Sequence, residues 1–144
     1  MDSVFRIRSL FTGALAAVAL LAAVPAAIAD DLPAFRKGLW EFDRTIDGGA
    51  GKKSKVSSRQ CINPGEDMRA QNARMEKAGC RFSPYARSGN QYTMTSQCKV
   101  MGISSNTKTV ITVESDSAYR LTVDGETDGE KTHEVMVAKR IGDC

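Results

Sequence analysis

The feature that most constrains the fold is a series of short segments in which apolar and polar side chains alternate. In the first of them Trp40, Phe42 and Ile46 share one parity, with Arg44 as the exception. A period of two is typical of a strand with one buried and one exposed face. The same alternation recurs along the chain, and the segments cover residues 38–46, 53–61, 80–86, 91–98, 107–115, 118–124 and 133–140. The sequence therefore predicts about seven strands.

Short polar segments separate these strands. RSGN (residues 87–90), DS (116–117) and DGETDGE (124–130) are typical of hairpin turns. Consecutive hairpins without long helical crossovers indicate antiparallel pairing. The predicted fold class is mainly β: an antiparallel meander of about seven strands forming an open or closed barrel, with one surface helix.

The helix is predicted over residues 63–79. Asn63 can cap it, and Pro64 fits its first turn. Met68 and Met75 form only a thin apolar stripe, so the helix is expected to lie against the sheet rather than inside it.

The first 29 residues have the pattern of a secretory signal peptide. Arg6 and Arg8 precede an apolar, Ala-rich run that ends in Ala-Ile-Ala, a small-x-small cleavage site. The alternative is a membrane anchor, which the limited length of the run and Pro25 disfavour. We therefore expect a periplasmic or secreted protein in which residues 30–144 form a single domain, with no stable membrane span after the signal is removed.

The charge balance argues against a nucleic-acid partner. The full chain has a formal net charge of +3, which falls to +2 when Arg6, Arg8 and Asp2 leave with the signal. Proteins that bind nucleic acid usually carry a strongly basic face.

All four cysteines lie after the predicted cleavage site, at Cys61, Cys80, Cys98 and Cys144. An even number in a small exported chain indicates two disulfides. Their separations of 19, 18 and 46 residues match neither a Cys-x-x-Cys redox motif nor paired zinc ligands. We expect neither a metal nor a cofactor.

The turn at RSGN favours one pair among the three possible connectivities. If residues 88–90 form a three-residue loop, Cys80 lies opposite Cys98 and Phe82 opposite Ser96. This register gathers the neighbouring apolar side chains on one face, whereas a slip by one residue would mix them with polar ones. Opposed strand positions are close enough for a disulfide.

Cys61 and Cys144 form the remaining predicted pair. If the helix returns along the sheet and the barrel closes, one strand alone separates the strands that carry them. Cys61 shares its parity with the lysine face of its strand, so a bulge or the helix cap must redirect it.

The chain resembles a family of exported bacterial proteins known as domain of unknown function 3617. The resemblance rests on KGLWEFDRT near the start, QCINP before the helix, YARSGNQYTMTSQC, and the terminal KRIGDC. It implies a location in the bacterial envelope and a small β-rich fold, and it supplies no reaction.

His133, the one histidine, is a weak catalytic candidate. The chain lacks a Gly-x-Ser-x-Gly elbow, and triad chemistry would need a nucleophile and an orienting carboxylate beside the imidazole. We expect a surface or rim histidine, and no enzymatic activity.

The acidic segment 124–130 allows a calcium-loop alternative. Asp124, Glu126 and Asp128 have the spacing of the first three ligands of such a loop. The twelfth position is Val135, where a bidentate Glu is required. An acidic hairpin turn is the favoured interpretation.

Two non-catalytic functions remain. The first is binding of an apolar or amphiphilic envelope molecule inside the barrel. The predicted lining residues are Trp40, Phe42, Phe82, Tyr92, Met94, Ile111, Tyr119 and Leu121. The alternative is a protein–protein interaction module that uses a sheet edge or the cationic strand face of Lys53, Lys55 and Arg59.

Overall fold

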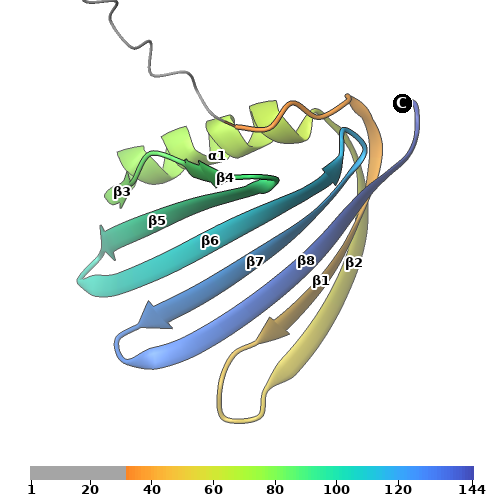
Figure 1. The fold of residues 1–144 in the computed structure, drawn as a ribbon. Coiled ribbons are helices and arrows are strands. Elements are labelled where there is room, and N and C mark those ends of the chain that lie inside the picture. The colour runs from red at the N-terminus through yellow and green to blue at the C-terminus, as the bar shows by residue number, and fades with distance from the viewer. Residues whose placement is uncertain (1–31) are drawn as a thin grey trace, which may run out of the picture.

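A computed structural model describes residues 32–144. The predicted signal peptide, residues 1–29, lies outside the described residues. The described chain forms eight β-strands and one α-helix (Figure 1). In chain order these are β1 Gly38–Asp47, β2 Lys53–Ile62, α1 Pro64–Lys77, β3 Cys80–Phe82, β4 Ala86–Ser88, β5 Gln91–Val100, β6 Ile103–Ser115, β7 Ala118–Thr127 and β8 Glu130–Gly142. The protein is mainly β, as the alternating pattern predicts.

The strands form one antiparallel sheet, which confirms the predicted meander. Their order is β2-β1-β8-β7-β6-β5-β3, and β4 also pairs with β5. The sheet is not closed, so of the two predicted forms the protein adopts the open one. Helix α1 connects the two edges of the sheet and lies along one side of the curled strands (Figure 1).

The predicted hairpin around RSGN is correct in its first part and displaced in its second. In β3 Cys80 lies opposite Cys98, as predicted. In β4 Ser88 lies opposite Gln91, so the loop contains two residues rather than three. The pairing therefore slips by one residue between β3 and β4, and the predicted single strand becomes two.

A break at residues 83–85 causes this slip. The break contains Pro84, which has no backbone N–H to give to a ladder. Just before Pro84, Ser83 donates its backbone N–H to the Thr95 carbonyl at 2.9 Å. In return Thr95 donates its N–H to the Ser83 hydroxyl, also at 2.9 Å. The Ser83 hydroxyl oxygen thus takes the place of a backbone acceptor. The strand can bend here without leaving the Thr95 N–H unpaired.

Two of the two-residue hairpin loops have positive φ at both positions. Met101 and Gly102 join β5 to β6, and Asp128 and Gly129 join β7 to β8, with positive φ at all four positions. This conformation is that of a type I′ turn, whose twist matches the flanking strands. The acidic segment 124–130 is therefore mostly strand, and its Asp-Gly pair alone makes the turn.

Helix α1 begins at Pro64, close to its predicted start. Asn63 occupies the cap position with an extended backbone, but its side chain makes no capping hydrogen bond. At the other end Gly79 has φ +111°, and a Cβ there would lie 2.7 Å from the Lys99 carbonyl oxygen. A glycine is needed to end the helix and let the chain re-enter the sheet at close range.

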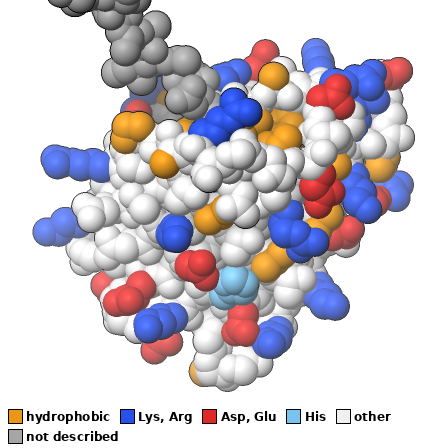
Figure 2. Space-filling view, viewed as in Figure 1, with side chains coloured by type: hydrophobic (Ala, Val, Ile, Leu, Met, Phe, Trp, Pro, Cys, Tyr) orange, Lys and Arg blue, Asp and Glu red, His pale blue; other side chains and the backbone are white. Residues whose placement is uncertain are grey.

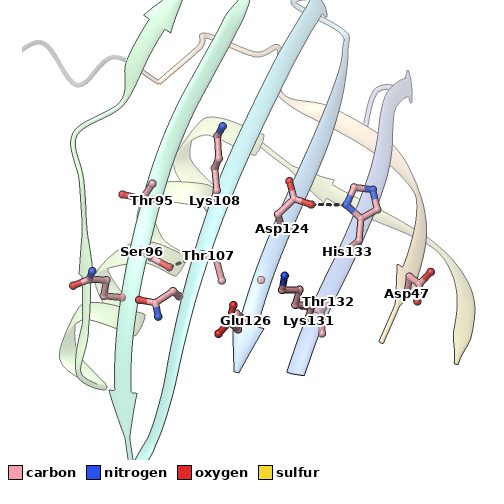
Figure 3. Close-up of a pocket in the computed structure, with 13 residues that line it drawn as sticks. Asp47, Thr95, Ser96, Thr107, Lys108, Asp124, Glu126, Lys131, Thr132 and His133 are labelled. Atoms are coloured by element: carbon pink, nitrogen blue, oxygen red, sulfur yellow. Dashed lines mark hydrogen bonds and ion pairs between the residues drawn. The ribbon is translucent and has the colours of Figure 1, made fainter. Parts of the chain in front are cut away.

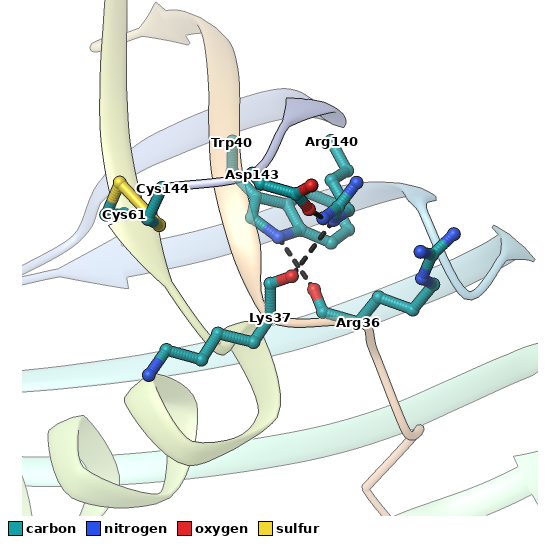
Figure 4. The surroundings of a disulfide bond; sticks show 7 residues. All are labelled: Arg36, Lys37, Trp40, Cys61, Arg140, Asp143 and Cys144. Carbon is teal, nitrogen blue, oxygen red and sulfur yellow. Dashed lines mark hydrogen bonds and ion pairs between the residues drawn. A yellow bond between two sulfur atoms is a disulfide. The ribbon is translucent and has the colours of Figure 1, made fainter.

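The hydrophobic core lies on the side of the sheet that faces α1. Its buried members are Phe35, Trp40, Tyr92, Ile111, Tyr119, Met136 and Ala138. The Phe35 ring centroid lies 5.9 Å from that of Trp40 and 4.7 Å from that of Tyr119. Trp40 is fully buried, and its indole N–H donates to the Arg36 carbonyl at 3.0 Å (Figure 4). Trp40 is therefore the anchor that fastens the N-terminal segment to the sheet.

Two disulfides join Cys61 to Cys144 and Cys80 to Cys98. These are the two pairs that the sequence favours. The first has a Cα–Cα distance of 5.7 Å and lies beside Trp40 at the C-terminal end of the chain (Figure 4). Cys61 precedes α1 and Cys80 follows it, so one disulfide is attached near each end of the helix.

Candidate functional site

A cleft of about 650 Å³ lies between α1 and the concave face of the sheet. Helix, edge strands and central strands all contribute to it. Its apolar lining consists of Phe42, Ile46, Val56, Ile62, Met68, Met75, Phe82, Tyr85, Met94, Ile111, Tyr119, Leu121, Val123 and Met136. This size is within the range of small-molecule sites in proteins.

The strand register arranges the floor of the cleft in rows. Ile111, Leu121 and Met136 lie side by side on β6, β7 and β8 and form an apolar row. A second row lies closer to the turn between β5 and β6. It contains Ser96 and Thr107, whose hydroxyl oxygens lie 2.6 Å apart. The floor therefore changes from apolar to polar along the strands, which suits a molecule with an apolar and a polar part.

Charged side chains stand among the apolar ones. Arg44 Nε lies 2.9 Å from Glu134 Oε1, and Arg44 also donates to the Met136 sulfur at 3.9 Å. Asp67 reaches the cleft from α1. Because the guanidinium is paired, the cleft presents no isolated positive charge to an anionic ligand.

Tyr119 stays neutral in this setting. Its burial raises the pKa of its hydroxyl well above the ordinary value, the negative charge of Asp67 raises it further, and Arg44 acts in the opposite direction. The hydroxyl therefore keeps its proton and offers an uncharged polar group in the cleft.

The helix side of the cleft is built from thioether and amide groups. Met68 and Met75 face the sheet together with Asn72, whose amide donates to the Met94 sulfur at 3.8 Å. Methionine side chains adapt their shape to what they contact. This wall can thus follow the outline of different apolar ligands.

Six of the eight predicted lining residues line the cleft. They are Phe42, Phe82, Met94, Ile111, Tyr119 and Leu121. Trp40 and Tyr92 do not line it; both are packed in the core beyond the cleft lining. Sequence reasoning missed the contribution of α1 and the pair Arg44–Glu134, although Arg44 already stood out as the one polar residue in an apolar alternation.

The opposite, convex face carries charges of both signs, which are interleaved over the face seen in Figure 2. The predicted cationic stripe lies there on β2, and β1 partly neutralises it. Arg59 Nη2 lies 2.6 Å from Glu41 Oε2, and Lys53 Nζ lies 3.5 Å from Asp47 Oδ2. Lys55 faces the neutral Thr45.

His133 lies on this convex face, within a shallow hollow of about 700 Å³ (Figure 3). Its Nδ1 is 2.7 Å from Asp124 Oδ1 across the β7–β8 pair, and both side chains are more than half exposed. Asp47 faces His133 from the other neighbouring strand. In residues 32–144 no group of three or more His, Cys, Asp or Glu side chains is placed to hold a metal ion. We interpret the pair as a cross-strand contact on a solvated surface.

The comparisons with known proteins now identify the family. Residues 35–144 match the family described as "Protein of unknown function (DUF3617)". The chain belongs to this family. No curated protein and no solved structure matches the chain. In the part of this DUF3617 protein that the structure describes, no helix is long and apolar enough to cross a membrane.

Proposed function

We propose that this DUF3617 protein binds an apolar or amphiphilic small molecule in the cleft under α1 and catalyses no reaction. The observation that carries the proposal is the floor of the cleft, where Leu121 and Val123 lie only half-buried on the central strand β7. Central strands of a small sheet normally bury such side chains against a second layer. A bound apolar group would supply that layer here.

The compartment is part of the proposal. The leader pattern of residues 1–29 and the two disulfides support export to the periplasm, because disulfides persist in oxidising compartments. We expect osmotic-shock fractions of the native host to contain the protein with no residue of the leader and with no free thiol. Recovery with reduced cysteines in the cytoplasmic fraction would contradict this part.

The ligand is tested by native mass spectrometry of protein purified from the envelope of its own host. We expect an added lipid-like mass that is removed by organic extraction. The matched pair of variants is Val123→Trp and Thr122→Trp. These neighbours lie on opposite faces of β7, so only the first fills the cleft. Loss of the added mass in Val123→Trp with retention in Thr122→Trp supports the proposal. Equal retention in both variants, or a protein that never carries such a mass, refutes it.

A further inference from the structure

Strand β2 forms one complete edge of the sheet. Within the described chain it pairs with β1 alone, over ten consecutive register positions without a bulge. Its first nine residues are all exposed. We propose that this edge is a docking site for an extended segment of another protein, with acidic residues on one face of that segment and apolar residues on the other.

The backbone of β2 is available for such pairing. Gly48 donates its N–H to the Lys52 carbonyl at 2.9 Å, which marks these two as a hydrogen-bonded pair. Hydrogen-bonded pairs alternate along an antiparallel ladder, so residues 54, 56, 58 and 60 bond to β1. The N–H and C=O groups of residues 53, 55, 57 and 59 therefore point away from β1, towards the open edge.

The charges of β2 specify the partner. From Lys53 to Ile62 the strand carries three cations, Lys53, Lys55 and Arg59, and no acidic residue. Strand β1 shows which side chains complement them, since its Glu41 and Asp47 pair with Arg59 and Lys53. A segment on the other side of β2 would meet the same cations on the convex face, and Lys55 is still opposite a neutral residue. Acidic residues at alternate positions of the partner satisfy this face.

The concave face of β2 favours apolar residues in the partner segment. Val56 lines the cleft next to the edge, and this residue is 52% exposed. An added strand would place its apolar face beside Val56. It would extend the floor of the cleft by one strand. The partner is therefore acidic on one face and apolar on the other, a form of strand addition.

Edge lysines also prevent aggregation, and that role alone would explain their charge. The other edge of this sheet shows how the protein blunts an edge, because β3 and β4 are short and Pro84 interrupts them. Strand β2 is neither short nor interrupted by a proline. Two copies paired through β2 would bring Lys53, Lys55 and Arg59 of both chains onto one face, so the charges favour a different, acidic partner over a second copy.

The test uses the full disulfide-bonded domain and a peptide with the β1 sequence GLWEFDRTID as the probe. Amide chemical shifts and hydrogen exchange report where the peptide binds. We expect shifts and new protection at residues 53, 55, 57 and 59. A peptide with Asn or Gln in place of its three acidic residues should bind about tenfold more weakly at low salt.

The matched protein variants are Lys55→Glu and Lys99→Glu, which make the same charge change on exposed strand positions at opposite ends of the sheet. Lys55→Glu should weaken binding about tenfold, and Lys99→Glu should leave it unchanged. Equal effects of the two variants, or no binding at millimolar peptide, overturn the proposal. Amide shifts along β8 would mean that the peptide replaces β1. Amide shifts confined to α1 would mean that the peptide enters the cleft. Self-association through β2 without peptide would assign the edge to a second copy. Each of these three outcomes refutes it as well.

Discussion

Cys61 and Cys144 are bonded across a strand to which neither belongs. Leu39 of β1 faces Cys61 on one side and Gly142 on the other, and the chain beyond Gly142 crosses this strand to reach Cys61. The last residue thereby fastens the end of β8 to the junction between β2 and α1. The order β2-β1-β8 is thus secured covalently as well as by backbone hydrogen bonds.

The two disulfides should differ in what they contribute to stability. The Cys61–Cys144 bond closes a loop with a sequence separation of 83, and the Cys80–Cys98 bond one of 18. On the chain-entropy model the first stabilises the fold by about 4–5 kcal/mol and the second by about 3 kcal/mol. Denaturant unfolding of the two double Cys→Ser variants measures the difference. A larger loss from the shorter loop would show that loop entropy does not dominate here.

Trp40→Ala should lower the free energy of unfolding by about 3–5 kcal/mol, because it removes the largest buried side chain and leaves a cavity. Val56→Ala is the control, since this side chain is exposed and should change stability by no more than about 0.5 kcal/mol. Urea titration followed by circular dichroism compares the two. Similar losses would mean that Trp40 does not anchor the core.

Gly38→Ala should destabilise the fold by about 1–3 kcal/mol. A Cβ at this position would lie 2.4 Å from Arg140 Nε and 2.5 Å from the Gly142 carbonyl oxygen. Arg140 Nε also donates to the Lys37 carbonyl at 2.9 Å, so the guanidinium is not free to move away (Figure 4). Gly142→Ala meets no atom within 4 Å and should be tolerated. Thermal unfolding of both variants distinguishes a packing limit from a general preference for glycine.

Stability should fall at high pH because of Tyr119. Its hydroxyl has a raised pKa in the folded protein, compared with 10.0 in a model peptide. The group therefore contributes its full stabilisation below pH 10, where both states are protonated. As the pH rises beyond that value the unfolded state loses the proton first, and unfolding becomes easier by about 1.4 kcal/mol per pH unit. Tyr119→Phe should lack this slope. Parallel slopes for both proteins between pH 9.5 and 11 would contradict the prediction.

The sequence predicts best where one face of a strand is buried. Around Trp40 and Ile111 the core imposes a strict alternation, and these strands appear where expected. The alternation is weaker near the turn between β5 and β6. There β6 begins at Ile103, whereas the sequence predicts a start at residue 107. Residues there are polar on both faces, such as Ser104 and Ser105, so periodicity carries no signal.

The cleft could be predicted only in part, because alternation reveals which side chains share a face but not what covers that face. Leu121 belongs to an apolar face in any register. Whether such a side chain meets α1, the core or open space depends on where the helix crosses the sheet. That crossing is set by tertiary packing, which also placed Trp40 and Tyr92 in the core.

The attachment of α1 near both ends limits how anything can enter the cleft. Cys61 lies just before Pro64 and is bonded to Cys144, which follows β8, and Cys80 lies shortly after Lys77 and is bonded to Cys98 of β5. Both ends of the helix are thus held by the disulfides, so a ligand of the proposed kind would enter past the flank of the helix rather than under a lifted end. Entry by this route would select molecules by their shape as well as by their affinity.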